Sequence, residues 1–401
     1  MKTLNDLLTP GCLPSDWREA TLLGRAWLPG SPAGPSPIAL RPDGEVVDLA
    51  ALAPTVSQLL ERPDRVAFVR AAPGRRIGTI EALLANSGDD RKPDLASLLA
   101  PCDLQPIKAS GVTFVQSLLE RVIEEQARGD TAKAEAIRSQ VMRIIGDNLA
   151  SVKPGSREAD EIKRVLVAQG AWSQYLEVGI GPDAEIFTKS QVMSAVGTGA
   201  EVGLHPKSSW NNPEPEIVLA VTCTGETVGA ALGNDVNLRD FEGRSALLLG
   251  KSKDNNASCA IGPFIRLFDD KFGIDDVRQA ELALEIAGTD GFVLDGVSSM
   301  SKISRDPLDI VTHAWGPHHQ YPDGFMLFLG TMFAPVKDRG APGMGFTHKI
   351  GDLVSISTPK LGRLVNRVTT SDRAPPWTFG ISALMHNLAA RGLLRPTQAR
   401  N

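Results

Sequence analysis

Apolar residues recur at helical spacing in one long segment, from Thr113 to about Asn148. Six of them share one face of the predicted helix, while charged residues fill the other face; the six are Phe114, Val115, Leu118, Leu119, Val122 and Ile123. We expect a break at Gly129-Asp130 and a second helix from Ser156 to Ala168. The segment "ISALMHNLAARGLL" predicts a further amphipathic helix near the end of the chain.

The other segments have a different pattern, in which Gly and Pro separate short β-branched runs. After about Gly179 these runs include "EIVLAVTC", "TVGAALGNDV" and "FMLFLGTMF", and such runs are typical of strands. Short strands and turns also dominate the beginning of the chain. We therefore predict an α+β protein, with a small N-terminal α+β domain over residues 1–104 and a β-rich domain over residues 105–401.

Composition narrows the class of protein. The 401 residues include 47 acidic and 42 basic side chains, for a net charge of −5, and the basic residues form no cluster. This argues against a nucleic-acid partner. We find no apolar run of about 18 residues and no secretory signal at the start, so we expect no membrane partner. Four cysteines without C-x-x-C spacing fit a reducing cytoplasm.

Glu214 and Glu216 stand two residues apart at the start of an apolar run. Because side chains alternate along a strand, both carboxylates are expected on the same side. Two like charges at the edge of a core are costly unless a cation lies between them. A hard divalent cation such as Mg²⁺ prefers carboxylate oxygens. The alternative interpretation is an exposed strand edge that carries two solvated glutamates.

Two further polar residues follow these glutamates. Asp235, in "GNDVNLRD", comes directly after a predicted strand and can supply a third carboxylate. Lys253, in "KSKDNN", precedes Gly262-Pro263. A lysine beside a metal ion loses its proton more easily, which makes it a candidate base. The alternative for Lys253 is an ordinary solvated charge.

The order of these motifs resembles the fumarylacetoacetate hydrolase family. That family carries E-x-E, then G-x-D-x-x-x-R-D, then a lysine ahead of G-P, and here "EPE", "GNDVNLRD" and "KDNNASCAIGP" follow in the same order. Gly330-Thr331 resembles the family's glycine-threonine loop. The segment "GDLVSISTPKLGRLVNRV" resembles its ending. The resemblance covers roughly residues 105 to 395.

The resemblance implies a fumarylacetoacetate-hydrolase-type catalytic domain with mixed β-sheets in a rolled sandwich. It also implies a homodimer or homotetramer that binds Mg²⁺, with Mn²⁺ or Ca²⁺ as substitutes. Lys253 maps to the family's lysine, and Thr331 maps to the loop that holds a substrate carboxylate. The implied metal ligands are Glu214, Glu216 and Asp235.

The histidines bear on which reaction of the family to expect. Hydrolases of the family activate water with a histidine that precedes the metal ligands, whereas all six histidines here lie at or after His205. "GVTF" instead matches a stretch of the sugar-acid dehydratase branch, and Arg305, in "ISRDP", suits the same branch. Arg305 can equally form a structural ion pair. The other candidate substrate contacts are Thr113, Ser117 and Arg121, although packing is the simpler role for this helix.

These features together predict a Mg²⁺-dependent dehydratase of pentose catabolism. It would convert a 2-keto-3-deoxy-pentonate, of the 2-dehydro-3-deoxy-D-arabinonate or xylonate type, to 2,5-dioxopentanoate. Lys253 is the candidate base at C3, and Glu185 is the candidate acid at the C4 hydroxyl. For Glu185, an ion pair with Lys189 is the alternative. The alternative activities are a metal-dependent C–C hydrolase of a 2,4-diketo-3-deoxy sugar acid and a 2-oxo-acid-binding protein without catalysis.

Overall fold

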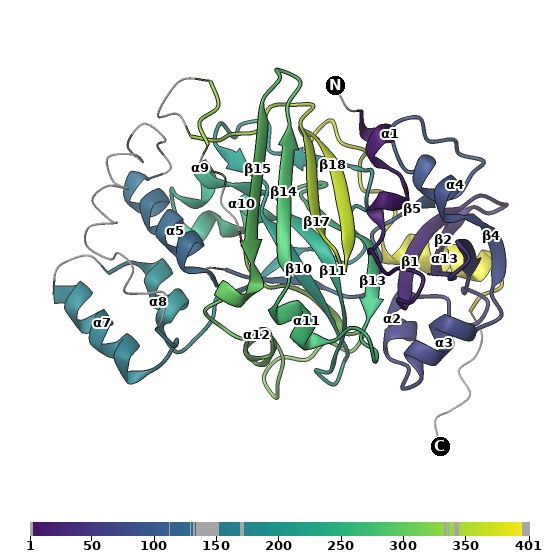
Figure 1. Ribbon diagram of the computed structural model, residues 1–401, viewed down its shortest axis with the longest axis horizontal. Coiled ribbons are helices and arrows are strands. Elements are labelled where there is room, and N and C mark those ends of the chain that lie inside the picture. The colour runs from purple at the N-terminus through teal and green to yellow at the C-terminus, as the bar shows by residue number, and fades with distance from the viewer. Residues whose placement is uncertain are drawn as a thin grey trace.

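The computed structural model describes residues 3–111, 113–128, 130, 133, 152–168, 172–332, 335, 337–340 and 345–394. Strands cross the middle of the molecule, and helices lie mainly at its two ends (Figure 1). At one end lie α5 (Val115–Ala127), α7 (Arg157–Ala168) and α8 (Gln174–Ile180). The other end holds α1 (Leu4–Leu7), α2 (Val56–Leu60), α3 (Arg65–Ala71), α4 (Ile80–Ala85) and α13 (Ile381–Ala390).

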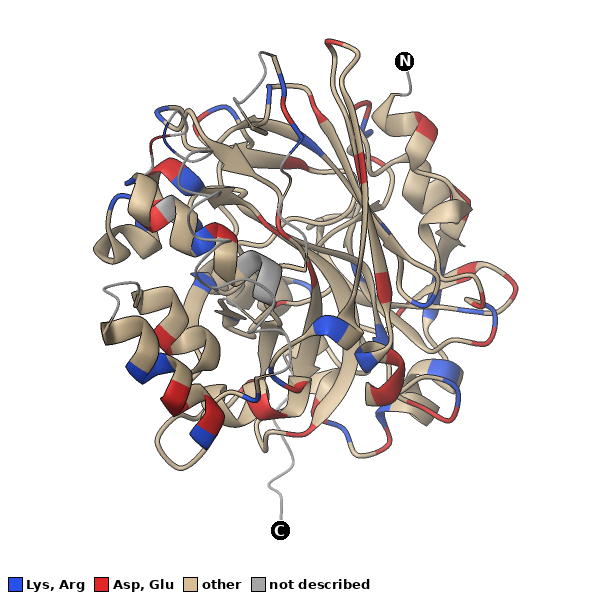
Figure 2. Ribbon diagram, turned by 60° about the vertical axis from the view of Figure 1, so that its left-hand side comes forward, with Lys and Arg blue, Asp and Glu red and all other residues tan. Residues whose placement is uncertain are grey.

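Charged residues are spread over the surface. Figure 2 shows Lys and Arg interspersed with Asp and Glu along the helices and loops of this face. Among the described residues, no helix is both long and apolar enough to cross a membrane.

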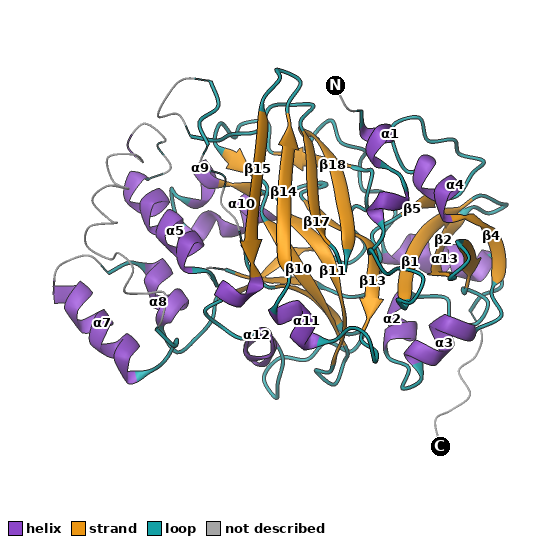
Figure 3. Ribbon diagram, viewed as in Figure 1, coloured by secondary structure: helices purple, strands orange, loops and turns teal. Residues whose placement is uncertain are grey.

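The helices agree with the predicted periodicity. Residues 115–127 form α5, with Leu118, Val122 and Ile123 buried; most of the predicted continuation to Asn148 lies outside the described residues. The helix predicted from Ser156 is α7, and the one predicted near the C-terminus is α13. Figure 3 shows shorter helices along the sheets: α9 (Arg239–Glu242), α10 (Leu249–Lys253), α11 (Ile274–Arg278) and α12 (Pro307–Ala314).

Within the described residues, the larger sheet has eleven strands. Ten follow in the order β4 (Arg75–Thr79), β3 (Glu45–Asp48), β2 (Gly34–Leu40), β1 (Leu22–Leu28), β13 (Cys259–Leu267), β11 (Thr227–Asp235), β10 (Pro215–Val221), β16 (Phe325–Phe328), β6 (Ile107–Ser110) and β7 (Ile186–Ser190). The eleventh, β5 (Ser97–Leu98), pairs with β1. The parallel pair β16–β6 makes the sheet mixed.

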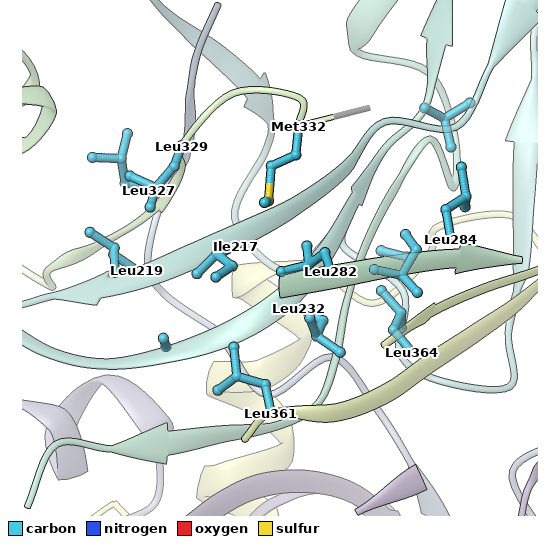
Figure 4. Close-up of a cluster of buried hydrophobic side chains, with 14 of the residues drawn as sticks. Ile217, Leu219, Leu232, Leu282, Leu284, Leu327, Leu329, Met332, Leu361 and Leu364 are labelled. Carbon is cyan, nitrogen blue, oxygen red and sulfur yellow. The ribbon is translucent and has the colours of Figure 1, made fainter. Parts of the chain in front are cut away.

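A second sheet has the order β15 (Val293–Ser299), β14 (Glu281–Ala287), β17 (Leu353–Thr358), β18 (Gly362–Thr370) and β8 (Glu201–Leu204). Apolar side chains of both sheets meet between them, which removes their surface from water. Figure 4 shows Ile217 and Leu232 of the larger sheet near Leu282 and Leu364 of the second. A short pair, β9 (Asn211–Asn212) with β12 (Asn237–Leu238), lies beside this sandwich.

The larger sheet continues across the predicted domain boundary at residue 104. β1 pairs with β13, with Leu22 opposite Arg266 and Leu23 opposite Ile265. The N-terminal strands therefore extend the larger sheet through backbone hydrogen bonds. The division into residues 1–104 and 105–401 stays a proposal.

Candidate active site

Glu214 and Glu216 lie at the start of the central strand β10, where both side chains are buried. They are 2% and 1% exposed, so the structure does not have the solvated strand edge that was the alternative. The neighbouring strand β11 brings Asp235 beside them, because Pro215 lies opposite Asn234 in the antiparallel pair. One carboxylate oxygen from each of the three residues lies within 4.8 Å of the other two. Strand pairing thus assembles a compact set of hard oxygen donors.

Lys253 ends α10, and its ammonium group lies against two of these carboxylates. Its Nζ is 2.5 Å from Glu214 Oε2 and 3.1 Å from Asp235 Oδ2. Burial opposes the charged form, but the charges of Asp235 and Glu214 outweigh it and raise the pKa of Lys253. The side chain is 2% exposed, so the alternative of a solvated lysine does not hold.

A second buried lysine lies behind Asp235. Lys189, on β7, is fully buried, with Nζ 2.8 Å from Asp235 Oδ1 and 3.1 Å from the Val236 carbonyl oxygen. The same Nζ donates to the backbone carbonyl of Lys253. Lys189 thereby ties Asp235 to the end of α10.

Arg121, on α5, also contacts one of the three carboxylates. Its guanidinium pairs with Glu214 and also with Glu242 of α9, 3.1 Å away. Burial raises the cost of ionising Glu214, but the charges of Arg121 and Lys253 outweigh it and hold the pKa of Glu214 at about 2.

The charges around the three carboxylates fit a further cation. The buried acids Glu214, Glu216, Asp235 and Glu242 outnumber the cations that contact them, which are Lys189, Lys253 and Arg121. In the described part of the chain, no cationic side chain forms an ion pair with Glu216; its Oε2 accepts a hydrogen bond from Gly330 N at 2.7 Å. Burial, together with the charges of Asp235 and Glu214, raises the pKa of Glu216 well above its ordinary value. A divalent cation would relieve this excess of negative charge.

Glu185 lies directly before β7 and packs against Gly111. A Cβ atom at Gly111 would come within 1.8 Å of Glu185 Oε2, so a larger residue at position 111 would displace the carboxyl group. Burial and the nearby charge of Glu242 raise the pKa of Glu185 to about 7. The alternative ion pair with Lys189 is not formed, because Lys189 contacts Asp235.

The candidate substrate contacts occupy different places. Thr331 is buried and follows Gly330, whose amide contacts Glu216, so it adjoins the carboxylates. The Thr113 hydroxyl donates to the Leu329 carbonyl oxygen at 2.5 Å and thus holds this loop. The side chain of Ser117 lies outside the described residues.

The side chain of Arg305 forms hydrogen bonds within the protein. Its Nη2 donates to the carbonyl oxygens of Val178 and Gly181, at 3.1 and 2.6 Å, where α8 ends. The nearest acid is Asp309, 3.8 Å away. A cation that satisfies the last carbonyls of a helix is a stabilising arrangement. The predicted contact between Arg305 and substrate stays a prediction.

The sequence reasoning missed two residues of this cluster, Lys189 as a support of Asp235 and Glu242 as a partner of Arg121. Because side chains alternate along a strand, Lys189 lies on the same side of β7 as Phe187 and the candidate acid Glu185. This alternation was the sequence feature that could have indicated a place for Lys189 near the site. Nothing in "RDFEGR" distinguishes a buried Glu242 from a solvated one, because its burial depends on α5 packing over α9.

No known family profile matches the chain. In sequence it is 29% identical over 196 residues to a probable 2-keto-3-deoxyxylonate dehydratase from Haloferax volcanii, covering 49% of this chain and 64% of that protein. It is 28% identical over 184 residues to 2-dehydro-3-deoxy-D-arabinonate dehydratase from Saccharolobus solfataricus, covering 46% and 58%. The match thus spans less than two thirds of the length of either relative.

Solved structures share the fold over most of the chain. The apo form of 2-keto-3-deoxy-D-arabinonate dehydratase matches with a TM-score of 0.61 at 19% identity, over 87% of this chain and 99% of that one. The complex of that enzyme with magnesium and 2,5-dioxopentanoate matches with a TM-score of 0.60 at 20% sequence identity, with the same coverage. Fumarylacetoacetate hydrolase from Exiguobacterium antarcticum matches with a TM-score of 0.54 at 15% sequence identity, over 88% of this chain and 100% of that one. The resemblance predicted from the motifs is therefore confirmed: this chain has the α+β fold of fumarylacetoacetate-hydrolase-type proteins, and its curated relatives are 2-keto-3-deoxy sugar-acid dehydratases.

Proposed function

We propose that the protein is a Mg²⁺-dependent dehydratase that converts a 2-keto-3-deoxy-pentonate to 2,5-dioxopentanoate. The observation that carries this proposal is the buried set of three carboxylates, with Lys253 in contact and a glutamate of raised pKa nearby. The names of the two curated relatives support the substrate class. We further propose that Mn²⁺ or Ca²⁺ can substitute for Mg²⁺ on the same oxygen donors.

Glu214, Glu216 and Asp235 would hold the metal. When bound, Mg²⁺ would polarise the 2-oxo group, acidify the hydrogens at C3 and lower the pKa of the adjacent Lys253. Lys253 would then accept the proton from C3. Lys189 and Arg121 keep Asp235 and Glu214 in place, because each forms an ion pair with one of these carboxylates.

Glu185 would supply the second proton transfer. With a pKa of about 7, a large fraction of this carboxyl group keeps its proton near neutral pH. It would give that proton to the C4 hydroxyl, which leaves as water while the C3–C4 double bond forms. The product of this step is a C3–C4 alkene that keeps its C5 hydroxyl. Loss of a proton from C5 and return of a proton to C3 then move the double bond to C4–C5, and this enol tautomerises to the aldehyde of 2,5-dioxopentanoate. We place the substrate carboxylate at Thr331, and we assign Arg121, Thr113 and Ser117 to the wall next to the sugar hydroxyls.

The direct test is incubation of the purified protein with 2-keto-3-deoxy-D-arabinonate or D-xylonate and Mg²⁺, followed by mass spectrometry. We expect 2,5-dioxopentanoate to accumulate, and EDTA to stop it. The alternative C–C hydrolase would release pyruvate from a 2,4-diketo-3-deoxy sugar acid. Unchanged 2-keto-3-deoxy-pentonate in the presence of folded protein and Mg²⁺ would overturn the proposal.

We also propose that the protein works in the cytoplasm as a homodimer or homotetramer. The four cysteines are free, which suits a reducing compartment. The oligomeric state rests on the resemblance described above. Light scattering coupled to size-exclusion chromatography measures the mass of the assembly, and a mass of about 43 kDa would contradict an oligomer.

A further inference from the structure

A cavity of about 580 Å³ lies between the N-terminal strands and the segment that follows β18. Its wall includes Arg25 and Trp27 of β1, Met193, and the aromatic residues Trp377 and Phe379. None of the proposed metal ligands, nor Lys253 or Glu185, lines it. Its size is that of a site for a small organic molecule.

Arg25 is the unusual feature of this cavity. The residue is only 5% exposed, yet none of the described residues forms an ion pair with its guanidinium, and the charge of Asp103 acts on it from farther away. Its Nη1 donates to the Cys102 carbonyl oxygen at 3.2 Å, and its Nη2 lies 3.9 Å from Met193 Sδ, a weak acceptor. The nearby Asp103 carboxylate accepts hydrogen bonds from the backbone amides of Val56 and Ser57. A buried guanidinium in this position lacks the anionic partner that normally offsets its desolvation.

The cavity wall favours an anion with a flat apolar body. Trp27 and Phe379 pack edge to face, with ring centroids 5.2 Å apart, and both line the cavity. Trp377 is 46% exposed and also lines it. Two acids, Asp89 and Glu201, also line the cavity, and Asp89 is paired with Arg367. Arg91 adds a second positive charge to that of Arg25. Aromatic faces accept planar groups, and a guanidinium matches a carboxylate in geometry.

We propose that this cavity is a second binding site, separate from the carboxylate cluster, for a small planar carboxylate. The carboxylate of the ligand would pair with Arg25, and its flat body would lie against Trp27, Phe379 and Trp377. Binding would join β1 to the segment around Trp377, which belong to opposite ends of the chain and lie at the same end of the molecule as α13 (Figure 1).

The test is isothermal titration calorimetry of the full-length protein, in EDTA, with benzoate and with its uncharged isostere benzamide. We expect benzoate to bind, and benzamide to bind at least ~10-fold more weakly, since a charge-assisted bidentate contact is lost. Equal affinities, or no benzoate binding, would overturn the proposal.

Variants locate the bound benzoate. Trp377→Ala should weaken binding several-fold, while Met385→Ala, which is 57% exposed and lies outside the cavity, serves as the matched control. Arg25→Met should abolish benzoate binding, provided that its circular dichroism spectrum matches that of the wild type. If Arg25→Met does not fold, Trp377→Ala still tests the site, because Trp377 is at an exposed position. Lys253→Met should leave benzoate binding unchanged. Loss of binding in Lys253→Met with wild-type circular dichroism, or equal binding by Trp377→Ala and Met385→Ala, contradicts the second site.

Discussion

At the scale of single residues, the neighbouring charges decide what each buried carboxylate can do. Glu214 is surrounded by cations, which keep its pKa at about 2, whereas Glu216 has a raised pKa and accepts a hydrogen bond from the backbone amide of Gly330. The two glutamates are two residues apart and share one face of β10, yet their electrostatic surroundings are opposite. A bound divalent cation would therefore stabilise the ionised form of Glu216 most.

Glu216→Gln tests this point. The amide is nearly isosteric but carries no charge, so Mg²⁺ binding should weaken by about 10-fold or more, with dehydration reduced in parallel. Calorimetric titration with Mg²⁺ measures the affinity. Glu281→Gln, at an exposed position on β14, should bind Mg²⁺ like the wild type. Undiminished Mg²⁺ affinity in Glu216→Gln would remove this residue from the ligand set.

Glu185 gives a prediction about pH. Because burial and Glu242 raise its pKa to about 7, it is protonated below that pH and loses its proton above it. If it is the acid, kcat should decline as the pH rises through about 7. Glu185→Gln should lower kcat by about 10²–10⁴-fold and abolish this limb of the profile. A mutant profile that keeps the same limb would assign the titration to another group; Glu226→Gln, on the surface, is the control.

At the scale of elements, paired strands and one glycine-dependent loop assemble the site. The pairing of β10 with β11 sets Asp235 beside the two glutamates, and the loop after β16 supplies the amide that contacts Glu216. Gly330 in this loop has φ of 94°, a conformation that residues with a side chain rarely adopt. A Cβ at Gly330 would also come within 2.0 Å of Thr113 Oγ1. The loop therefore requires glycine at position 330 for two reasons, the positive φ and the close approach of Thr113.

We expect Gly330→Ala to displace this loop and to cost about 1–3 kcal/mol of stability. The amide contact to Glu216 should weaken, and kcat/KM should fall because Thr331 moves with it. Urea unfolding and steady-state kinetics measure the two effects. Gly316→Ala is the matched control, because a Cβ there meets no atom within 4 Å and its φ is not positive. Wild-type kinetics in Gly330→Ala would show that the loop tolerates a Cβ.

Local patterns predicted the parts of this site that follow from strand geometry. Alternation along β10 placed Glu214 and Glu216 together, and the order of motifs added Asp235 and Lys253. Lys189 and Glu242 escaped prediction because their partners come from distant segments. For Arg305, the sequence pattern suggested a role that the contacts do not display. Its context suits a substrate contact, whereas its guanidinium donates a hydrogen bond to a carbonyl oxygen at the end of α8. Nor did any local pattern indicate that β1 pairs with β13, more than 200 residues later.

At the scale of the whole molecule, that pairing is reinforced by an ion pair between a buried arginine and a half-buried aspartate. Arg266 of β13 is fully buried, and its two terminal nitrogens lie 2.7 and 3.0 Å from the Asp16 carboxylate, which also accepts from Lys360. Asp16 precedes β1, while Lys360 lies between β17 and β18. One carboxylate therefore connects the N-terminal segment to both sheets of the sandwich.

Asp16→Asn should reduce the free energy of unfolding at pH 7 by on the order of 2 kcal/mol, because it leaves Arg266 buried without its anion. Burial raises the pKa of Asp16, but Arg266 and Lys360 outweigh it and lower that pKa below its ordinary value. A lowered folded-state pKa stabilises the protein above the unfolded pKa of about 4, and this stabilisation disappears as the pH falls toward the folded value. The gap between wild type and Asp16→Asn in urea unfolding should therefore narrow below pH about 4. Asp94→Asn, at an exposed position, should show no such dependence, and a constant gap for Asp16→Asn would mean that the charge of Asp16 does not hold the two parts together.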